Sequence, residues 1–446
     1  MKKAKKYGSK KGTGQKLWQK AKKLIPGGNQ LLSKRAEMFL PDQWPAYYSK
    51  AKGCEVWDLD SNHYYDMGRM AVGSCLLGYA DPDVNKAVKD AVNRGSMSTL
   101  NAPEEVELAE LLCALHPWAH MARFARGGGE AMAIAVRIAR AHTDRDIIAF
   151  CGYHGWADWY LATNLGTTDG LKEHLLAGLD AKGVPRGLRG SILPFRYNHL
   201  EELEAIVKHA GKRLAAIVME PLHSEEPKDN FLKKIRAIAD KTGAVLIFDE
   251  VSIGWKLTYG GAHLIYGVNP DMAVFSKAMS NGFPMAAIIG KRAVMQAAQD
   301  TFISSTYWTD RTGPAAALAT LKKMKKVNVP KRIKAAAAQM RAGWASVAKK
   351  HGLKINIGGT VPYNLFSFQY DDAQALKTLF TQEMLERGFL ASTEFNPSCA
   401  HTSAHIKRYS KALDGVFAEI RKALDTDSVR KRLKGPIAHS HFARLN

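Results

Sequence analysis

Two short apolar runs end in charged residues: LIFDEV at residues 246–251 and DMAVFSK at residues 271–277. Continuous apolar runs of this length are typical of strands that are buried on both faces of a parallel sheet. Open sheets of this kind bind ligands at the carboxyl ends of their strands, so we expect Asp249 or Glu250 to face a ligand. The alternative is that the carboxylate caps a following turn or helix.

The lysine at the end of the second run is a candidate for covalent chemistry. A lysine directly after a buried strand is costly unless it is used. Partial burial lowers a lysine's pKa and frees its amine to attack carbonyls, as in enzymes that form Schiff bases. The alternative is that Lys277 reaches solvent or forms an ion pair.

Signals on both sides of these runs predict an α/β fold. Apolar runs also stand at 147–150 (IIAF) and 214–219 (LAAIVM), and helical stretches alternate with such runs from about residue 104 to 320. This alternation predicts a mostly parallel sheet covered by helices. We expect a basic arm with hairpin strands, a large domain and a smaller α+β domain with a basic tail at residues 1–75, 76–320 and 321–446.

Two loops next to predicted strands carry residues suited to a flat, phosphorylated ligand. RGGGEA at 126–131 precedes a predicted helix, whose first backbone N–H groups would hold a phosphate. Three glycines could also form a simple flexible turn, and no Walker-type GK[ST] follows. In GYHG at 152–155, Tyr153 or His154 could stack on a flat cofactor or pack within the loop.

The composition predicts a large globular protein with a basic surface. The 446 residues, of which 46% are hydrophobic, are enough for two or three packed units. The formal net charge is +22, with lysines crowded at residues 2–23 and basic residues at 430–434. No recognition helix or aromatic-interleaved basic motif stands out, so nucleic-acid binding is not expected. A solvated basic surface or attraction to anionic metabolites explains the charge.

The sequence shows no membrane, secretory or metal-binding pattern. It contains no apolar run of about 18 residues and no secretory signal at its start, so we expect a cytoplasmic protein without membrane contact. The five cysteines are scattered without a CxxC pair and should be free thiols. Cys399, His401 and His405 lack a fourth ligand at a zinc spacing, so no metal site is predicted.

Taken in order, these segments resemble those of the class III aminotransferases, and among them the glutamate-1-semialdehyde 2,1-aminomutases. The family's SGTEA-like loop, YHG, DEVxTGF and SK segments have counterparts at 127–131, 153–155, 249–255 and 276–277. Its PGG, GFP and AHT segments are matched at 26–28, 282–284 and 400–402. The resemblance covers roughly residues 20–425. It implies a fold type I pyridoxal-phosphate-dependent transferase, in which the large domain has a mainly parallel seven-stranded mixed sheet and both chain ends form a small α+β domain.

The resemblance also implies the cofactor, pyridoxal 5'-phosphate, and its contacts. Backbone N–H groups of Gly128 and Gly129 would bind the phosphate. Tyr153 and Val251 would lie on opposite faces of the ring. Asp249 would meet the pyridine nitrogen and keep it protonated, so that the ring withdraws electrons.

Two further residues have roles implied by the resemblance. Lys277 would hold the cofactor as a Schiff base and, once displaced, would move a proton between Cα of the substrate and C4' of the cofactor. Thr306 resembles the threonine that reaches the phosphate of the neighbouring subunit's cofactor. A homodimer with the active site at the subunit interface is therefore implied.

The sequence departs from the family pattern in segments that we expect to determine substrate specificity. The usual Ser-Gly-Thr is Gly127-Gly128-Gly129, TGF(R) is Ile253-Gly254-Trp255-Lys256, and residues 308–314 replace GNP. Arg35, in the segment that replaces the aminomutases' NSPVRAF, is a candidate anion binder or a solvent-facing side chain. Glu220 and His223 are candidates for the substrate pocket, with helix capping as the alternative for the segment that follows Glu220.

We therefore predict an aminotransferase that moves an amino group from a small-molecule donor to a carbonyl acceptor through a pyridoxamine phosphate intermediate. Three alternatives stay open. One is intramolecular transfer on glutamate 1-semialdehyde, and another is amination of a keto-sugar or surface-polysaccharide precursor. The third is a catalytically inactive protein of this fold that binds pyridoxal phosphate or nucleic acid.

Overall fold

The computed structural model describes residues 12–166, 170–172, 174, 179–222, 224–441 and 445. The chain divides into two compact units, one formed by Met1–Asp81 with Lys331–Asn446 and the other by Pro82–Pro330. We predicted boundaries after residues 75 and 320, whereas the units divide after residues 81 and 330. The second boundary lies later because helix α11 (Thr312–Val327) packs against α3 (Pro82–Asn93) and α4 (Pro103–Leu115).

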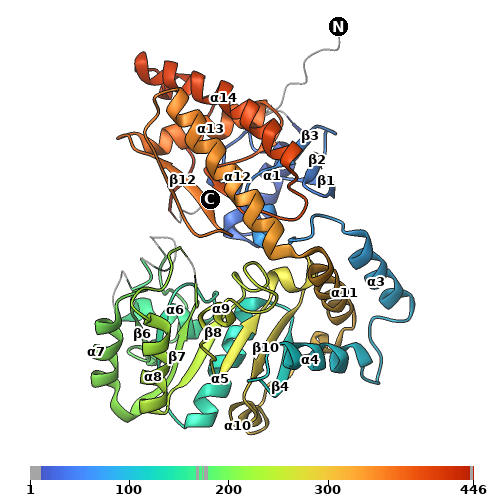
Figure 1. Cartoon of the computed structure of the whole chain (residues 1–446), viewed down its shortest axis with the longest axis vertical. Coiled ribbons are helices and arrows are strands. Elements are labelled where there is room, and N and C mark those ends of the chain that lie inside the picture. Colours follow the sequence, from blue (N-terminus) through green and yellow to red (C-terminus); the bar gives the residue numbers. More distant parts are fainter. Residues whose placement is uncertain are drawn as a thin grey trace. The chain divides into compact units, whose positions relative to one another are not determined.

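The unit of residues 82–330 is built on a sheet whose seven strands, within the described residues, have the order β4-β10-β9-β8-β7-β5-β6 (Figure 1). The strands are β4 Met121–Ala125, β5 Ile147–Cys151, β6 Ile192–Pro194, β7 Leu214–Met219, β8 Val245–Asp249, β9 Met272–Phe275 and β10 Ala286–Gly290. β10 pairs antiparallel with β4 and β9, whereas the other pairs are parallel. The predicted mainly parallel, mixed sheet of seven strands is confirmed.

Helices cover both faces of this sheet. Besides α3, α4 and α11, they are α5 Gly128–Thr143, α6 Asp158–Leu161, α7 Leu200–Ala210, α8 Phe231–Thr242, α9 His263–Tyr266 and α10 Arg292–Met295. Alternate residues of β5 enter two different cores: Ile148 and Phe150 join the core that contains α5 residues, and Ile147 and Ala149 join the core with α7 and α8. Because both faces are covered, the strands read as continuous apolar runs in the sequence.

The other unit contains, in its described residues, a four-stranded and a three-stranded sheet. These are β1 Tyr48–Lys52, β2 Glu55–Asp58, β3 His63–Asp66 and β13 Phe389–Leu390, and then β11 Ile355–Gly358, β12 Asn364–Phe368 and β14 Glu394–Phe395. The helices are α1 Thr13–Leu24, α2 Met70–Gly73, α12 Val329–Lys350, α13 Ala373–Glu386 and α14 Ser403–Asp425. β13 pairs in parallel with β3, so both ends of the chain share one sheet, as predicted. None of the helices in the described ranges has the length and apolar character needed to cross a membrane.

Candidate active site

Most of the residues that we predicted to form the site lie at one edge of the seven-stranded sheet. β4, β5, β7, β8 and β9 all run in the same direction, so their carboxyl ends lie at the same edge. The glycine loop 127–129 follows β4, Tyr153 follows β5, Glu220 follows β7, Asp249 ends β8 and Lys277 follows β9. This is the edge at which open α/β sheets bind their ligands.

Asp249 is a buried carboxylate held by a buried imidazole. Its Oδ2 lies 2.8 Å from Nδ1 of His154, and its Oδ1 accepts the Val251 N–H at 2.9 Å. The side chains of His154 and Asp249 are 0% and 4% exposed. Nε2 of His154 lies 3.0 Å from the Cys151 carbonyl, which can only accept, so Nε2 carries a proton and Nδ1 faces the carboxylate. The pair is therefore either an ion pair or one shared proton.

The second carboxylate, Glu250, has a structural role. It accepts the backbone N–H groups of Ala262 and His263 at 2.9 and 3.0 Å, at the start of α9. His263 Nδ1 lies 2.8 Å from the same carboxylate, and Trp118 donates its indole N–H to His263 Nε2 at 3.1 Å. The capping alternative therefore holds in part for both carboxylates: Glu250 caps a helix, and Asp249 accepts the Val251 N–H at the start of the following turn.

Lys277 is brought to the end of β8 by an unusual backbone conformation. It begins the short 3-10 helix η6 (Lys277–Ser280) with φ of 43°. This left-handed conformation costs about 1–2 kcal/mol for a residue with a Cβ atom. The Nζ atom donates to Ser252 Oγ at 2.5 Å, three residues beyond Asp249. The amine and the carboxylate therefore face the same end of the sheet.

Two of the three glycines in the loop leave little room for a side chain. A Cβ atom on Gly128 would lie 2.7 Å from Val251 Cγ1, and one on Gly129 would lie 3.2 Å from Trp156 Cδ1. Gly127 is the N-cap of α5, a helix of 16 residues. The loop thus exposes the start of a long helix, where the dipole favours an anion, and it holds Val251 against the backbone.

Glu220 and Lys256 add two buried charges to this edge. Glu220 Oε2 accepts the Tyr153 N–H at 3.4 Å. Burial, and then the Asp249 carboxylate, raise the pKa of Glu220 to about 7. Burial, and then the Lys277 amine, lower the pKa of Lys256 to about 7, although Glu220 opposes this shift. Each of the two groups therefore changes its charge near neutral pH.

Thr306 lies on the surface in an exposed turn. It begins η8 (Thr306–Thr309), and the neighbouring Tyr307 side chain is 72% exposed. The guanidinium of Arg126, directly before the glycine loop, donates to the carbonyl oxygens of Trp308 and Asp310. The phosphate-loop segment and the Thr306 turn are therefore connected by one side chain.

The structure does not test the other two predicted substrate residues. Arg35 belongs to the unit of residues 1–81 and 331–446, where its guanidinium lies against Gly27. His223 lies outside the described residues. Neither is placed at the sheet edge by the structure.

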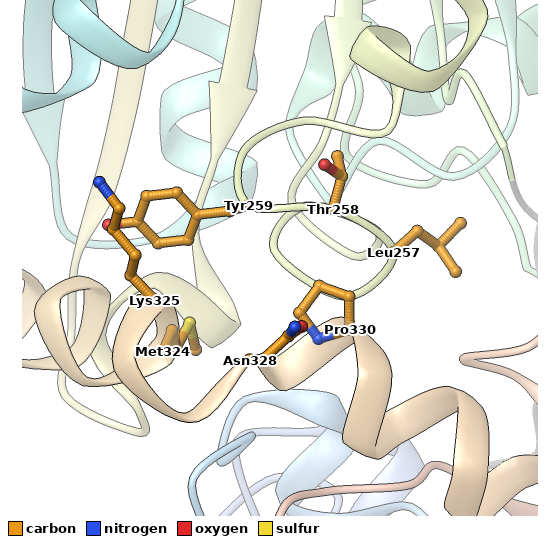
Figure 2. A pocket seen from close by; sticks show the side chains of 7 residues that line it. All are labelled: Leu257, Thr258, Tyr259, Met324, Lys325, Asn328 and Pro330. Atoms are coloured by element: carbon orange, nitrogen blue, oxygen red, sulfur yellow. The ribbon is translucent and has the colours of Figure 1, made fainter.

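The three residues that directly follow Lys256 line part of a pocket of about 320 Å³ (Figure 2). It is lined by Leu257, Thr258, Tyr259, Met324, Lys325, Asn328 and Pro330. The ammonium group of Lys325 lies 5.9 Å from the centre of the Tyr259 ring, and the two side chains are drawn beside each other in Figure 2. None of the predicted site residues lines this pocket.

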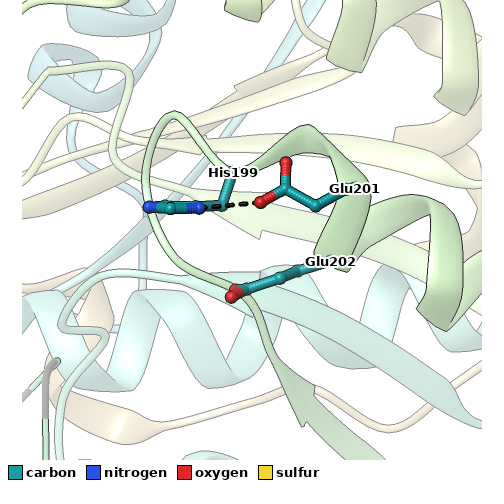
Figure 3. Close-up of side chains that lie close together, drawn as sticks. All are labelled: His199, Glu201 and Glu202. Carbon is teal, nitrogen blue, oxygen red and sulfur yellow. Dashed lines mark hydrogen bonds and ion pairs between the residues drawn. The ribbon is translucent and has the colours of Figure 1, made fainter.

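His199, Glu201 and Glu202 form a surface cluster at the start of α7 (Figure 3). His199 Nδ1 lies 2.8 Å from Glu201, and Glu202 accepts the backbone N–H and the Nε–H of Arg196, both at 2.7 Å. Both carboxylates thus have a protein partner. We interpret the cluster as an ion-pair network around the helix start.

The family comparison identifies the kind of protein that carries this sheet edge. The model of the family "Aminotransferase class-III" matches residues 40–417. The chain belongs to the class-III aminotransferases. It is therefore an enzyme of the predicted family, and this family uses pyridoxal phosphate, as predicted.

Two curated relatives of this class-III aminotransferase differ in the activity that their names give. The 3-aminobutyryl-CoA aminotransferase of Cloacimonas acidaminovorans is 30% identical, over 92% of this chain and 97% of its own. The glutamate-1-semialdehyde 2,1-aminomutase of Thermodesulfovibrio yellowstonii is 31% identical, over 91% of this chain and 98% of its own. Both the predicted activity and its aminomutase alternative are therefore found among relatives.

A solved structure supports the predicted fold. The FumI protein of Sphingopyxis sp. MTA144, solved in its PLP internal aldimine form, is 26% identical with a TM-score of 0.83. The match covers 93% of this chain and 98% of the FumI chain. The fold type I architecture of this aminotransferase is thereby confirmed.

Sequence reasoning missed two features of this aminotransferase. His154 was considered for stacking, yet its ring is buried against Asp249. Lys256 was noted as a departure from the family pattern, without the buried position that the structure gives it. The sequence signal for the first feature was a histidine close to the end of a strand. The signal for the second feature was a lysine within an apolar turn.

Proposed function

We propose that this class-III aminotransferase moves an amino group from a small amino donor to a carbonyl acceptor, with pyridoxal phosphate held at the carboxyl edge of the seven-stranded sheet. One observation carries the proposal. β8 and β9 are parallel neighbours, and they end in a buried carboxylate, Asp249, and in the amine of Lys277. An acid and an amine at adjacent strand ends are the two groups that this cofactor requires.

The residues present fit the cofactor. Gly128, which has no space for a Cβ atom, and Gly129, where a Cβ atom would be tightly packed, would let the phosphate approach the first N–H groups of α5. Val251, whose methyl group lies at the Gly128 backbone, would pack on one face of the ring, and Tyr153 on the other. Asp249 would meet the ring nitrogen, and Lys277 would hold the aldehyde end through its amine.

Within this arrangement each side chain has a defined task. When bound, pyridoxal phosphate supplies an aldehyde for the amine and a ring that withdraws electrons from the substrate's Cα. Asp249, fixed by His154, keeps a negative charge where a protonated ring nitrogen would lie. The Lys277 Nζ, when its amine is free, would take the proton from the substrate's Cα. Glu220 would face the substrate side, and we retain Arg35 and His223 as further candidates there.

A spectroscopic experiment tests this function. The purified protein with pyridoxal phosphate should show a visible absorption band that borohydride bleaches, and an amino donor should convert this band to that of the amine form. Adding a carbonyl acceptor should restore the first band. A protein that binds the cofactor but shows no change with any amine in a broad panel would contradict the proposal.

The aminomutase is a second candidate, because relatives such as the Thermodesulfovibrio yellowstonii enzyme are 31% identical over most of the chain. Incubation with glutamate 1-semialdehyde distinguishes the aminomutase activity from the aminotransferase activity. An aminomutase forms 5-aminolevulinate without consuming an external amino donor. An intermolecular aminotransferase needs stoichiometric donor for each acceptor that is aminated.

Replacing Gly128 by alanine should weaken cofactor binding. The added methyl group would lie 2.7 Å from Val251 Cγ1 and would push this side chain toward the ring position. Overpacking of this kind costs about 1–3 kcal/mol, so we expect an affinity for pyridoxal phosphate about 5- to 150-fold lower. Titration of the apoprotein with the cofactor measures this. Gly187→Ala is the matched control, since an added Cβ atom there meets nothing within 4 Å.

We further propose a homodimer in which Thr306 reaches the phosphate of the partner subunit's cofactor. The exposed Thr306 turn and the large exposed side chains next to it, Tyr307 at 72% and Phe302 at 85%, support an interface here. Light scattering that gave the mass of a single chain would contradict it. A cytoplasmic setting is proposed as well, because all five cysteines are free.

A further inference from the structure

Ser252 is a hydrogen-bond partner of the Lys277 amine. Lys277 Nζ donates to Ser252 Oγ at 2.5 Å. Both residues are half-buried, whereas Ile253–Lys256, which follow Ser252, and Met272–Ser276, which precede Lys277, are buried. The contact between the amine and the hydroxyl therefore lies where these two segments become accessible.

The turn that carries Ser252 has a fixed position. The N–H of Gly254 donates to the Glu250 carbonyl at 2.8 Å. A Cβ atom on Gly254 would lie 2.8 Å from Phe275 Cδ1, so the turn packs closely against the end of β9. The backbone of Ser252 therefore has little freedom to move relative to the strand that leads into Lys277.

The backbone beside Lys277 is fixed as well, but its long side chain is not. The buried Ser276 hydroxyl donates to the Met285 carbonyl at 2.8 Å, and the Ser276 carbonyl accepts the Met279 N–H at 3.0 Å. A lysine side chain is a flexible four-carbon stem, which loses rotamer freedom only where its end is held. The contact with Ser252 supplies such a hold for the amine of Lys277.

We propose that Ser252 is a positioning residue that orients the free amine of Lys277 for proton transfer at the substrate's Cα. A neutral amine has two N–H groups and one lone pair. When one N–H donates to Ser252 Oγ, one staggered position about the Cε–Nζ bond is favoured, and the lone pair is directed away from the hydroxyl. Orientation matters because a base that is displaced by about 1 Å loses rate by up to about 100-fold. The alternative is that Ser252 only completes the turn.

This inference rests on the proposed function, in which Lys277 takes a proton from the substrate. In that step the Cα–H bond breaks, its electron pair is left on Cα, and the proton is added to the lone pair of Nζ. The ammonium group that forms can still donate to Ser252 Oγ, and a charged donor strengthens the hydrogen bond. The same contact therefore serves the amine before and after the proton transfer.

The hydroxyl at this position is a feature of this chain. The pattern DEVxTGF leaves the position of Ser252 open and has a threonine directly after it, where this chain has Ile253. The side chain of Ile253 is buried and carries no polar atom. The turn therefore carries its hydroxyl one residue earlier than the pattern does, at the position that contacts Lys277.

The test is the rate at which an amino donor converts the cofactor-loaded protein to its amine form in a single turnover. The donor is L-alanine or L-glutamate, whichever converts the parent protein faster, with and without deuterium at Cα. In Ser252→Ala this rate should fall about ten-fold. The primary isotope effect should be at least as large as in the parent protein, because the Cα–H step is the one that is slowed. Ser252→Thr keeps the hydroxyl and should stay within about two-fold of the parent rate.

A second readout and a control separate positioning from other roles. Titration of the apoprotein with pyridoxal phosphate should give an affinity within about two-fold of the parent value for Ser252→Ala, since the proposed contact is with the amine and not with the cofactor. Ser191→Ala is the matched control. Ser191 is also half-buried, donates to the Leu188 carbonyl at 2.7 Å and precedes β6 at the opposite edge of the sheet, so both readouts should be unchanged.

Four results would overturn the inference. A rate in Ser252→Ala at or above the parent rate would mean that the hydroxyl is idle or blocks the lone pair. Equal losses in the alanine and threonine variants would indicate packing. A smaller isotope effect would show that a step other than Cα–H cleavage was slowed. A loss of cofactor affinity as large as the loss of rate would mean that Ser252 acts on the cofactor.

Two further outcomes are covered by the design. If Ser252→Ala fails to fold, as judged by circular dichroism, Ser252→Cys takes its place with the same expected results, because a thiol has a similar shape and is a weak hydrogen-bond acceptor. If no amine in the broad panel converts the parent protein, the proposed function itself fails. That failure is distinct from a converting parent protein whose Ser252 variants behave like it, which overturns the positioning role alone.

Discussion

Replacing Lys277 by alanine should abolish the borohydride-reducible adduct with pyridoxal phosphate and lower the rate of amino transfer by about 10⁴-fold. The effect is large because one amine performs two tasks, holding the cofactor and moving the proton at Cα. The position of Lys277 supports both, since its Nζ donates to Ser252 Oγ beside the end of β8. Absorbance spectra and single-turnover rates with the amine form of the cofactor measure the two losses separately.

Lys291→Ala is a suitable control for this variant. Lys291 follows β10 and pairs with Asp271 at 2.7 Å, away from the carboxyl edge, so the adduct should persist. Added methylamine should partly restore the proton transfer in Lys277→Ala, because a small amine can enter the space that the side chain leaves. Mass spectrometry of the reduced parent protein should locate the adduct on Lys277. An adduct on Lys256 would show that the nucleophile has been assigned to the wrong amine.

Much of the sheet was predictable because its strands are buried on both faces. The runs at 214–219 and 272–275 coincide with β7 and β9, and both consist of fully apolar residues. Strand β10 (Ala286–Gly290) was not predicted. Its antiparallel direction depends on pairing with β4, which lies far away in the sequence, and local pattern carries no information on such pairing.

The site was predictable to the extent that it follows from topology. Asp249, Lys277 and the glycine loop are each next to a strand end, and parallel strands bring their carboxyl ends to one edge. The contacts between segments that are distant in the sequence could not be predicted from the sequence. His154 meets Asp249 across 95 positions, and Arg126 meets Trp308 across 182. Such pairs are set by how loops pack after the sheet has formed.

The different contacts of Asp249 and Glu250 also could not be predicted from the sequence pattern. The two carboxylates are neighbours in the sequence and equally buried, at 3% and 1% exposure. Only the packing of α9 against the end of β8 decides which of them receives the helix N–H groups. The sequence therefore predicted that one carboxylate would serve a ligand, and the family resemblance was needed to choose Asp249.

Asp249→Asn should slow amino transfer while leaving the lysine adduct intact. The change keeps the shape of the side chain and removes the charge opposite the ring nitrogen, and it leaves His154 without its carboxylate. Loss of a buried charge pair costs about 3 kcal/mol or more, and if this cost falls on the transition state, the rate should decrease by at least about 100-fold. The adduct should still form, since Lys277 is unchanged. Rapid-mixing absorbance measurements with an amino donor follow both steps in one experiment.

His154→Gln provides the matched comparison, because an amide can still donate to Asp249 but bears no charge. If His154 acts only through Asp249, the double variant should be no slower than Asp249→Asn alone, whereas independent roles would multiply the two losses. A rate in Asp249→Asn within about two-fold of the parent protein would mean that this carboxylate does not meet the ring nitrogen. The buried pair at the end of β8 would then be a structural ion pair, like that of Glu250 with His263.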